Sequence, residues 1–210
     1  MAIVWPCPLS VDEYEAAGRG VVVPRPDCPG CLAPMSFWSG YMRSLRCGGP
    51  WLRVWLRRAR CGPCGVTHVL VPSFCLPGRL DGVEVIGAAV GAVVGGGEGV
   101  RPVAARLDVP YTTARGWVRR FARRAAVLVA ALSAVTVELC GWAPVLPVEP
   151  TAGALAAITA AFTAMLARAG PQPLGLWPFA GLVTGGALLA ANTDPLSIIL
   201  GNRRFMAPVP

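Results

Sequence analysis

The sequence contains two Cys-x-x-Cys motifs, Cys28-Pro-Gly-Cys31 and Cys61-Gly-Pro-Cys64, separated by 29 residues. In each motif a Pro and a Gly let the backbone curl tightly, so that both thiolates can face one ion. Two such turns supply the four ligands of a tetrahedral structural zinc site. We therefore expect Cys28, Cys31, Cys61 and Cys64 to hold one structural Zn²⁺.

The residues between and after the motifs carry the pattern of short β-strands. Residues 36–45 are rich in aromatic side chains, residues 48–50 read Gly-Gly-Pro, and residues 51–60 alternate apolar with Arg or Trp side chains. This pattern predicts a β-hairpin. Residues 66–71 predict a third strand, which ends at Pro72. The amino-terminal part is thus expected to be a small zinc ribbon.

The other cysteines and the single histidine are interpreted as structural residues. Cys7, Cys47, Cys75 and Cys140 have no partner at motif spacing and are expected to behave as small hydrophobic side chains. His68 is expected to be a strand residue. Whether His68 or Cys47 assists the metal site stays open at this point.

The amino terminus predicts a short helix and no export signal. Ser10 and Glu13 have capping-box spacing and open a helix to about Ala17. Residues 21–23 predict a short strand. Residues 1–8 have no basic segment and contain two Pro, so a secretory signal is not expected. We therefore expect a cytoplasmic, reducing compartment, in which metal ligation is favoured over disulfides.

The second cysteine motif carries a family resemblance. Residues 57–68 read Arg-Arg-Ala-Arg-Cys-Gly-Pro-Cys-Gly-Val-Thr-His. This run resembles the second knuckle of the zinc ribbons that begin many bacterial insertion-sequence transposases, in which basic residues precede CxxCG, Thr and an aromatic residue. His68 takes the place of that aromatic residue. The resemblance covers residues 26–72 and implies a ribbon that binds nucleic acid.

A helix-turn-helix is predicted after the ribbon. Residues 82–95 predict a helix weakened by internal glycines, and residues 100–107 predict a second one. Asp108 suits the left-handed position of a turn. Pro110 then starts a third helix. The order of a helix, a turn and a further apolar helix is typical of a helix-turn-helix, whose second helix lies in the major groove.

Positive charge is concentrated in the middle of the chain. The sequence has no Lys, so all 19 of its basic residues are Arg, against 11 carboxylates. Residues 43–80 contain seven Arg and no carboxylate, whereas residues 125–210 are neutral. Binding to a polyanion such as DNA releases counterions and favours such a stretch.

The predicted recognition helix carries side chains suited to DNA. Base contacts are expected from the residues at its start and outer face, Tyr111, Thr112, Thr113, Arg115 and Gly116. Phosphate contacts are expected from Arg119, Arg120, Arg123 and Arg124. The hairpin is expected to grip the DNA backbone through Arg53, Arg57 and Arg58. A plain helical hairpin with a solvated Arg face is the alternative.

This region also carries a resemblance. Residues 103–110, with Thr113, Arg115, Trp117 and the run 119–121, resemble the helix-turn-helix of transposase-type and related regulatory proteins. A ribbon followed directly by this motif resembles the front half of insertion-sequence transposases. It also resembles a bacterial family of stand-alone proteins associated with mobile elements. The resemblance implies an accessory factor, a targeting factor or a regulator linked to a transposable element, with a transposase or recombinase as partner.

The carboxyl-terminal half does not supply the catalytic part of a transposase. Strand transfer needs a carboxylate triad on a sheet, and residues 125–210 offer only three carboxylates, none in a strand pattern: Glu138, Glu149 and Asp194. We therefore expect no enzymatic activity. Helices are predicted at 125–139, 151–168 and 176–191, followed by a loose tail. Because the apolar runs are short or broken by Pro, we expect no membrane span.

The prediction is an α+β chain in three parts: a zinc ribbon with a short helix (1–78), a helix-turn-helix (79–125) and a helical region with a tail (126–210). We expect a zinc-containing, sequence-specific protein that binds double-stranded DNA, with no small-molecule substrate; homodimerisation stays open. One alternative is a protein-interaction module that partners a separate transposase subunit. Another is a membrane-associated sensor with a zinc-binding head.

Overall fold

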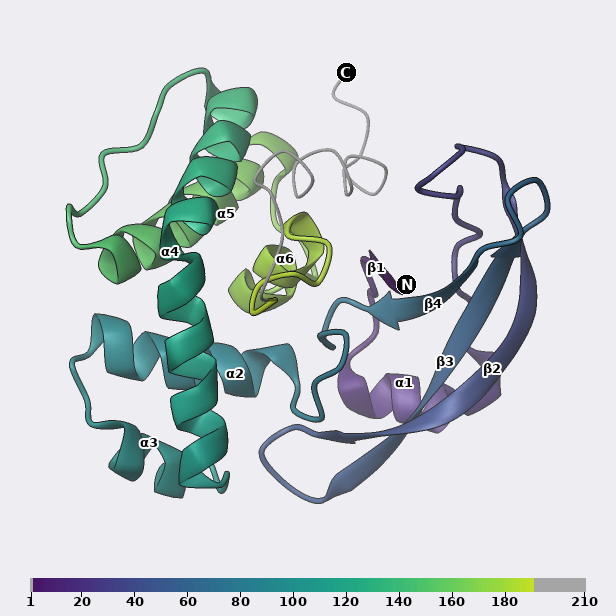
Figure 1. The fold of residues 1–210 in the computed structure, drawn as a ribbon, viewed down its shortest axis with the longest axis horizontal. Coiled ribbons are helices and arrows are strands. Elements are labelled where there is room, and N and C mark those ends of the chain that lie inside the picture. Colours follow the sequence, from purple (N-terminus) through teal and green to yellow (C-terminus); the bar gives the residue numbers. More distant parts are fainter. Residues whose placement is uncertain (1, 191–210) are drawn as a thin grey trace.

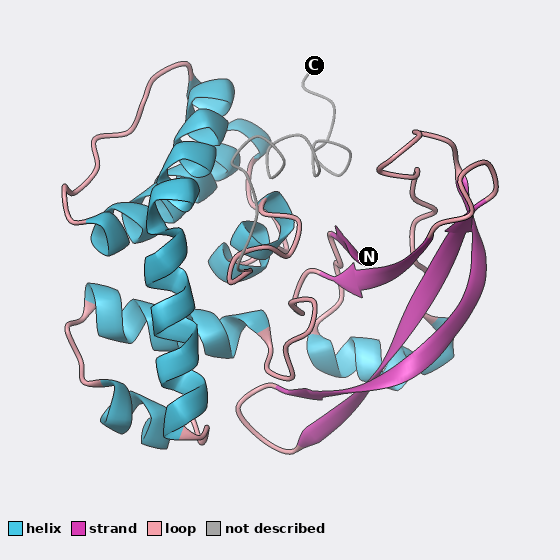
Figure 2. Ribbon diagram, viewed as in Figure 1, coloured by secondary structure: helices cyan, strands magenta, loops and turns pink. Residues whose placement is uncertain are grey.

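A computed structural model describes residues 2–190 of the chain. It contains a four-stranded sheet and six α-helices, which confirms the α+β class. Most helices lie on one side of the molecule, and the sheet with helix α1 lies on the other (Figures 1 and 2). Helix α6 lies between the two.

The sheet is built on the predicted hairpin. Its strand order is β1-β4-β3-β2, with β1 parallel to β4 and the other neighbours antiparallel. The strands are β1 (Ala2–Trp5), β2 (Met35–Arg46), β3 (Trp51–Cys61) and β4 (Thr67–Pro72). The hairpin and the third strand are therefore confirmed. Strand β1 was not predicted, because four residues between Met1 and Pro6 become a strand only through pairing with β4.

The predicted strand at residues 21–23 is wrong. Burial alternates there as in a strand, with Val22 exposed between buried Val21 and Val23, but the segment forms no ladder with the described strands. Pro24 and Pro26 follow and lack the N–H groups that a ladder needs.

Helix α1 (Val11–Ala17) begins with the predicted capping box. The Ser10 hydroxyl accepts from the backbone N–H of Glu13, and the Glu13 carboxylate accepts from the backbone N–H of Ser10. These hydrogen bonds lower the pKa of Glu13. The chain then makes a short 3₁₀ turn, η1 (Gly18–Gly20). The capping prediction is confirmed.

Helix α1 covers the part of β3 that extends beyond the end of β4. The buried Tyr14 hydroxyl donates to the Trp55 carbonyl oxygen at 2.8 Å, and the backbone N–H of Arg53 donates to the Glu15 carboxylate at 2.6 Å. Both partners are β3 backbone groups left free by β4, which pairs with β3 only over residues 58–60. The helix thus closes an open sheet edge.

The remaining helices form a bundle around α4. In chain order they are α2 (Val83–Val90), the π-helical turn η2 (Gly91–Gly95), α3 (Val100–Arg106), α4 (Tyr111–Cys140), α5 (Pro150–Ala169) and α6 (Leu176–Val183). Helix α4 packs along α5 with its carboxyl-terminal half and crosses α2 and α3 with its amino-terminal half (Figure 1). It runs without a break through residue 125, where we predicted the boundary between the helix-turn-helix and the carboxyl-terminal helical region.

Asp108 has the left-handed conformation that the sequence predicts. Its φ is +50°, and the backbone N–H of the next residue, Val109, donates to the Ala104 carbonyl oxygen at 3.0 Å. This bond closes the end of α3 and turns the chain into α4. Val109 is buried against the helices.

This conformation predicts how substitutions of Asp108 act. Asp108→Gly is expected to unfold at the same urea concentration as the wild type or at a higher one, because glycine adopts positive φ without steric cost. Asp108→Val is expected to lose about 1–2 kcal/mol, the cost of a left-handed L-residue. Urea unfolding followed by circular dichroism measures both changes. Asp108→Asn is the control, since asparagine tolerates this conformation; a loss as large as that of Asp108→Val would show that charge, not backbone geometry, matters.

Helix α6 is shorter than predicted. It ends at Val183 rather than at residue 191, because the Thr184 hydroxyl donates back to the Ala180 carbonyl oxygen at 2.7 Å and Gly185 and Gly186 have positive φ. The predicted loose tail after residue 191 lies outside the described residues.

Two groups of buried side chains correspond to the two sides of the molecule. One contains the inward side chains of the sheet and α1, and the other those of α2 to α6. Leu182 of α6 belongs to the sheet group although its neighbours Ala180 and Val183 belong to the helical group. Helix α6 therefore joins the two.

One described helix, α5, is long and apolar enough to cross a membrane by length and composition alone. Its mean hydropathy over 18 residues is 1.5, and a third of that window is buried. It packs along α4 (Figure 1). Core helices of soluble proteins have the same length and composition, so the expectation of no membrane span stays a prediction.

Candidate metal centre and nucleic-acid interface

The two cysteine motifs fold into turns with the same hydrogen bonds. The backbone N–H of Cys28 donates to the Ala33 carbonyl oxygen at 2.8 Å, and that of Cys61 donates to Val66 at 2.9 Å. In both turns the residue four positions after the first cysteine donates back to the carbonyl of that cysteine and has positive φ: Leu32 at +65° and Gly65 at +69°. Each turn therefore directs its two sulfur atoms to one side.

The turns bring the four predicted sulfur atoms together. Strand pairing places Met35 opposite Cys61, so the first turn lies beside the second. The Sγ atoms of Cys28 and Cys64 are 3.5 Å apart, those of Cys31 and Cys61 are 3.3 Å apart, and all four lie within 4.8 Å of one another. A zinc–sulfur bond of about 2.3 Å gives sulfur–sulfur separations of about 3.8 Å in a tetrahedron. The cluster can hold one metal ion, and its chemistry is compatible with structural zinc.

The cluster is half enclosed by protein. Cys28 and Cys61 are buried, whereas Cys31 and Cys64 are exposed. Backbone N–H groups of Cys31 and Gly30 lower the pKa of Cys28 to about 6 and favour its thiolate, the form that binds a metal. The Cys64 N–H acts on Cys61 in the same direction, but burial and the neighbouring sulfurs prevail and raise its pKa to about 12.

His68 and Cys47 do not belong to the cluster. The metal-binding group consists of the four motif cysteines alone among the described residues. His68 is buried in β4 beside Ala59, and burial lowers its pKa. Cys47 follows β2 at the opposite end of the hairpin, where burial raises its pKa to about 11. Neither His68 nor Cys47 therefore assists the metal site, which answers the question that the sequence left open.

Helix α4 presents most of the predicted DNA-binding side chains to solvent. Its buried face includes Ala114, Trp117 and Phe121. The opposite face carries exposed Arg115, Arg119 and Arg123, four residues apart and therefore in one row about 12 Å long. This row is flanked by exposed Thr112 and Arg120 and by half-buried Thr113 and Gly116.

Tyr111 is half covered by α3. It begins α4 and is 39% exposed. The Arg101 guanidinium of α3 lies 5.4 Å from the centre of its ring. Arg106, the last residue of α3, pairs instead with Glu98 through two hydrogen bonds of 2.6 and 3.0 Å.

Arg124 does not lie on the exposed row. It is 4% exposed, because it follows Phe121 by three residues and precedes Leu128 by four, and both of these are buried. Its Nε and Nη2 have no hydrogen-bond partner among the described residues, and burial lowers its pKa. In this conformation Arg124 cannot reach a phosphate, contrary to the role predicted for it.

The predicted hairpin arginines lie on β3 at different depths. Arg53 and Arg58 are exposed, whereas Arg57 is half-buried. The Arg57 guanidinium stacks 5.0 Å from the centre of the Phe37 ring and donates to the Arg19 carbonyl oxygen at 3.4 Å. The exposed aromatic side chains beside these arginines were not predicted as site residues, although the alternation of Arg with Trp along residues 53–57 was visible in the sequence.

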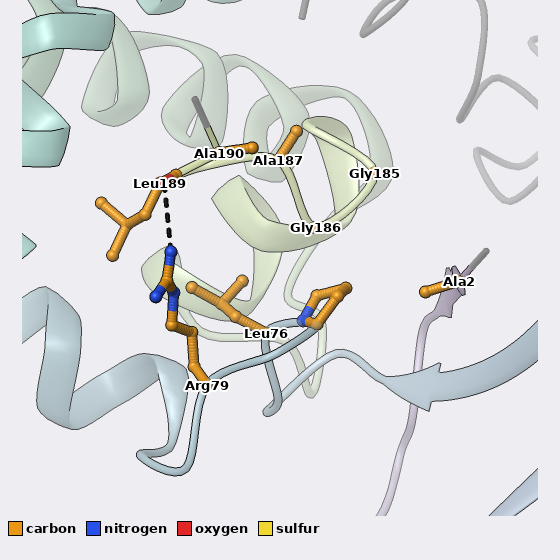
Figure 3. Close-up of a pocket in the computed structure, with 9 residues that line it drawn as sticks. Ala2, Leu76, Arg79, Gly185, Gly186, Ala187, Leu189 and Ala190 are labelled. Carbon is orange, nitrogen blue, oxygen red and sulfur yellow. Dashed lines mark hydrogen bonds between the residues drawn. The ribbon is translucent and has the colours of Figure 1, made fainter. Parts of the chain in front are cut away.

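A small pocket lies between the β4–α2 loop and the chain after α6. Its volume is about 350 Å³, and Figure 3 shows Leu76 and Arg79 on one side and Gly185, Gly186 and Leu189 on the other. Among residues 2–190, Arg79 is the only charged residue that lines it, and its guanidinium donates to the Leu189 carbonyl oxygen at 3.4 Å. The pocket thus offers one cation among apolar and backbone groups.

Comparison of the chain with protein families, with curated proteins and with solved structures gives no significant match. The resemblance to insertion-sequence transposases therefore rests on the sequence motifs alone and stays a prediction.

Proposed function

We propose that this protein is a zinc-stabilised DNA-binding protein in which α3 and α4 act as a helix-turn-helix and the cysteine end of the sheet acts as a zinc ribbon. The row Arg115, Arg119 and Arg123 on α4 is the observation that carries the proposal. It lies opposite the buried face of the helix and directly follows a tight turn with Asp108 at positive φ.

The arrangement of α4 supports base and phosphate contacts from one helix. Thr112 and Arg115 lie in its first two turns, the part of a recognition helix that meets base edges. Arginine is the most frequent bidentate partner of guanine. Arg119 and Arg123 lie one and two turns further and suit phosphate contacts. Arg124 is left out of the proposed interface because it is buried.

The metal cluster supports the proposal indirectly. It lies where β2 begins and β3 ends, and β3 carries both Arg53 and Arg58. A structural zinc in a Cys₄ site fixes local geometry and does not act on a substrate. We propose that the ion is zinc and that it orients the basic hairpin.

The direct test is the affinity of the metal-loaded protein for duplex DNA at increasing salt. If the four arginines assigned to phosphates, Arg119 and Arg123 on α4 and Arg53 and Arg58 on β3, make these contacts, the logarithm of the affinity should fall with the logarithm of salt with a slope of up to about −3.6. Fluorescence anisotropy with labelled duplexes measures this slope. A slope near zero would reject the phosphate contacts. Selection from random duplexes then tests whether α4 distinguishes sequences.

A role linked to a transposable element is the finer part of the proposal. It is supported only by the resemblance of residues 57–68 and 103–121 to the ribbon and helix-turn-helix of insertion-sequence transposases. An adjacent gene for a recombinase with a carboxylate triad would support it.

A further inference from the structure

The outer face of the β2–β3 hairpin combines exposed aromatic rings with arginines. Cross-strand pairs share one face of a sheet. The pairs Arg46–Trp51, Met42–Trp55 and Gly40–Arg57 therefore lie together on the face opposite the buried Leu45, Val54 and Leu56. On this face Trp51 and Arg53 are exposed and Trp55 and Arg57 are half-buried, whereas Ala59, the partner of Phe37, is buried.

Several rings at this hairpin are held by a stacked guanidinium. Arg46 lies 5.5 Å from the ring centre of Trp51, Arg57 lies 5.0 Å from that of Phe37, and Arg60 lies 5.2 Å from that of Trp38. The three rings are nevertheless 54%, 37% and 61% exposed. A guanidinium on one side of a ring leaves the other side free for a second planar group.

Two local features of the strands turn the rings outward. Trp38 is an extra residue in β2 at the point where the register with β3 shifts, and such bulges re-aim side chains. Its ring stacks on Arg60, which alternates along β3 with Leu56, so Trp38 is exposed on the other face of the hairpin from Trp51. Trp55 lies flat on β2 over Gly40, since a side chain at residue 40 would come within 2.3 Å of the Trp55 ring. Arg19 of η1 stacks on the same ring at 4.7 Å.

The charge of this face favours an anionic partner. Strands β2 and β3 carry six arginines and no carboxylate, and three of the six lie on this face: Arg46, Arg53 and Arg57. Two carboxylates from outside the strands lie against them: Asp81 accepts from the Arg46 side chain at 2.6 Å, and Glu15 accepts from the Arg53 backbone N–H at 2.6 Å. The row of rings and arginines from Trp51 to Ala59, the partner of Phe37, is about 26 Å long at the usual rise of a strand.

We propose that this face binds single-stranded nucleic acid, with unpaired bases stacked on Trp51 and Phe37 and phosphates held by the adjacent arginines. Proteins that bind single strands without sequence preference combine these two features. A duplex cannot use the rings, because its bases are already stacked on one another. The inference concerns a different surface from the α4 row and does not depend on the duplex-binding proposal.

The test compares aromatic variants in binding to single strands. The probes are fluorescein-labelled oligo(dT) and oligo(U) of about 20 nucleotides. This length exceeds the roughly 4–16 nucleotides that one OB-fold domain covers when it binds a single strand. Trp51→Ala and Phe37→Ala are each expected to lower the affinity roughly 5- to 150-fold, since one stacked base contributes about that factor. Trp51→Phe is expected to keep most of the affinity, because phenylalanine still offers a ring. The two oligonucleotides show whether DNA or RNA is preferred, and tight binding of either one supports the proposal.

Trp142→Ala is the matched control. Trp142 is 70% exposed and lies in the link after α4, away from the sheet, so its loss should leave the affinity unchanged. Metal content and thermal midpoint verify that each variant is folded. If Trp51→Ala and Phe37→Ala act no more strongly than Trp142→Ala, or if they weaken duplex binding equally, the proposal is overturned. If the wild type binds single strands but does not bind duplex DNA, only the α4 proposal is rejected.

Discussion

Cys61→Ser is expected to abolish metal binding and to unfold the sheet side of the protein. Cys61 is buried at the end of β3, and its sulfur lies 3.3 Å from that of Cys31 in the other turn. The metal would join two turns that the chain otherwise links only through the hairpin. Structural zinc supplies about 10–16 kcal/mol in zinc-finger peptides, which is as much as the whole stability of a typical domain.

Metal analysis and near-ultraviolet circular dichroism measure this loss. The wild type should contain one metal ion per chain and the variant none, and removal of the ion by a chelator should have the same effect as the substitution. Far-ultraviolet signal from the helices should persist, because α2 to α5 have their own buried cluster. A metal-free Cys61→Ser protein with native near-ultraviolet signal would show that the cluster is not a folding element.

Two other cysteines serve as controls for the loss of a thiol. Cys140→Ser removes a half-buried thiol of α4 that donates to the Thr136 carbonyl oxygen, and a serine hydroxyl can make the same bond. Cys75→Ser places a hydroxyl in the buried core of the sheet and is expected to cost about 1–3 kcal/mol. Neither substitution should change the metal content.

Short-range signals in the sequence predicted most of the local structure. The paired Cys-x-x-Cys turns, the capping box of Ser10 with Glu13 and the left-handed Asp108 depend on residues within about five positions of one another. Their chemistry determines the backbone locally, so they could be read from a single sequence. The approach of the two turns followed from the hairpin between them.

Features that depend on distant contacts were not predictable in this way. Strand β1 requires the edge of β4, about 65 residues away, and the end of α6 depends on a Thr hydroxyl and two glycines rather than on hydrophobic pattern. Arg124 was assigned to an interface by its charge, whereas its depth is determined by Phe121 and Leu128 on the same helix face. Helical spacing would have indicated its burial.

Alanine substitutions along the exposed row of α4 are expected to separate base contacts from phosphate contacts. Arg115→Ala should reduce the discrimination between the best duplex and a single-base variant by about 1–3 kcal/mol, because Arg115 lies where base edges are met. Arg123→Ala should weaken all duplexes equally and lower the salt slope by about 0.9, the effect of one lost phosphate contact. Anisotropy titrations with two duplexes at several salt concentrations measure both quantities.

Two arginines of the same charge provide matched controls. Arg124→Met removes a buried guanidinium one residue from Arg123, so it should leave the salt slope unchanged and be neutral or stabilising in urea, as replacement of poorly paired buried charges often is. Arg168→Ala removes an exposed charge on α5 whose guanidinium donates to the Leu139 carbonyl oxygen. Leu139 lies about 24 Å from Arg123 along α4, so this charge is far from the exposed row. If these two variants lower the slope as much as Arg123→Ala does, total charge rather than the exposed row governs DNA binding, and α4 is not the recognition helix.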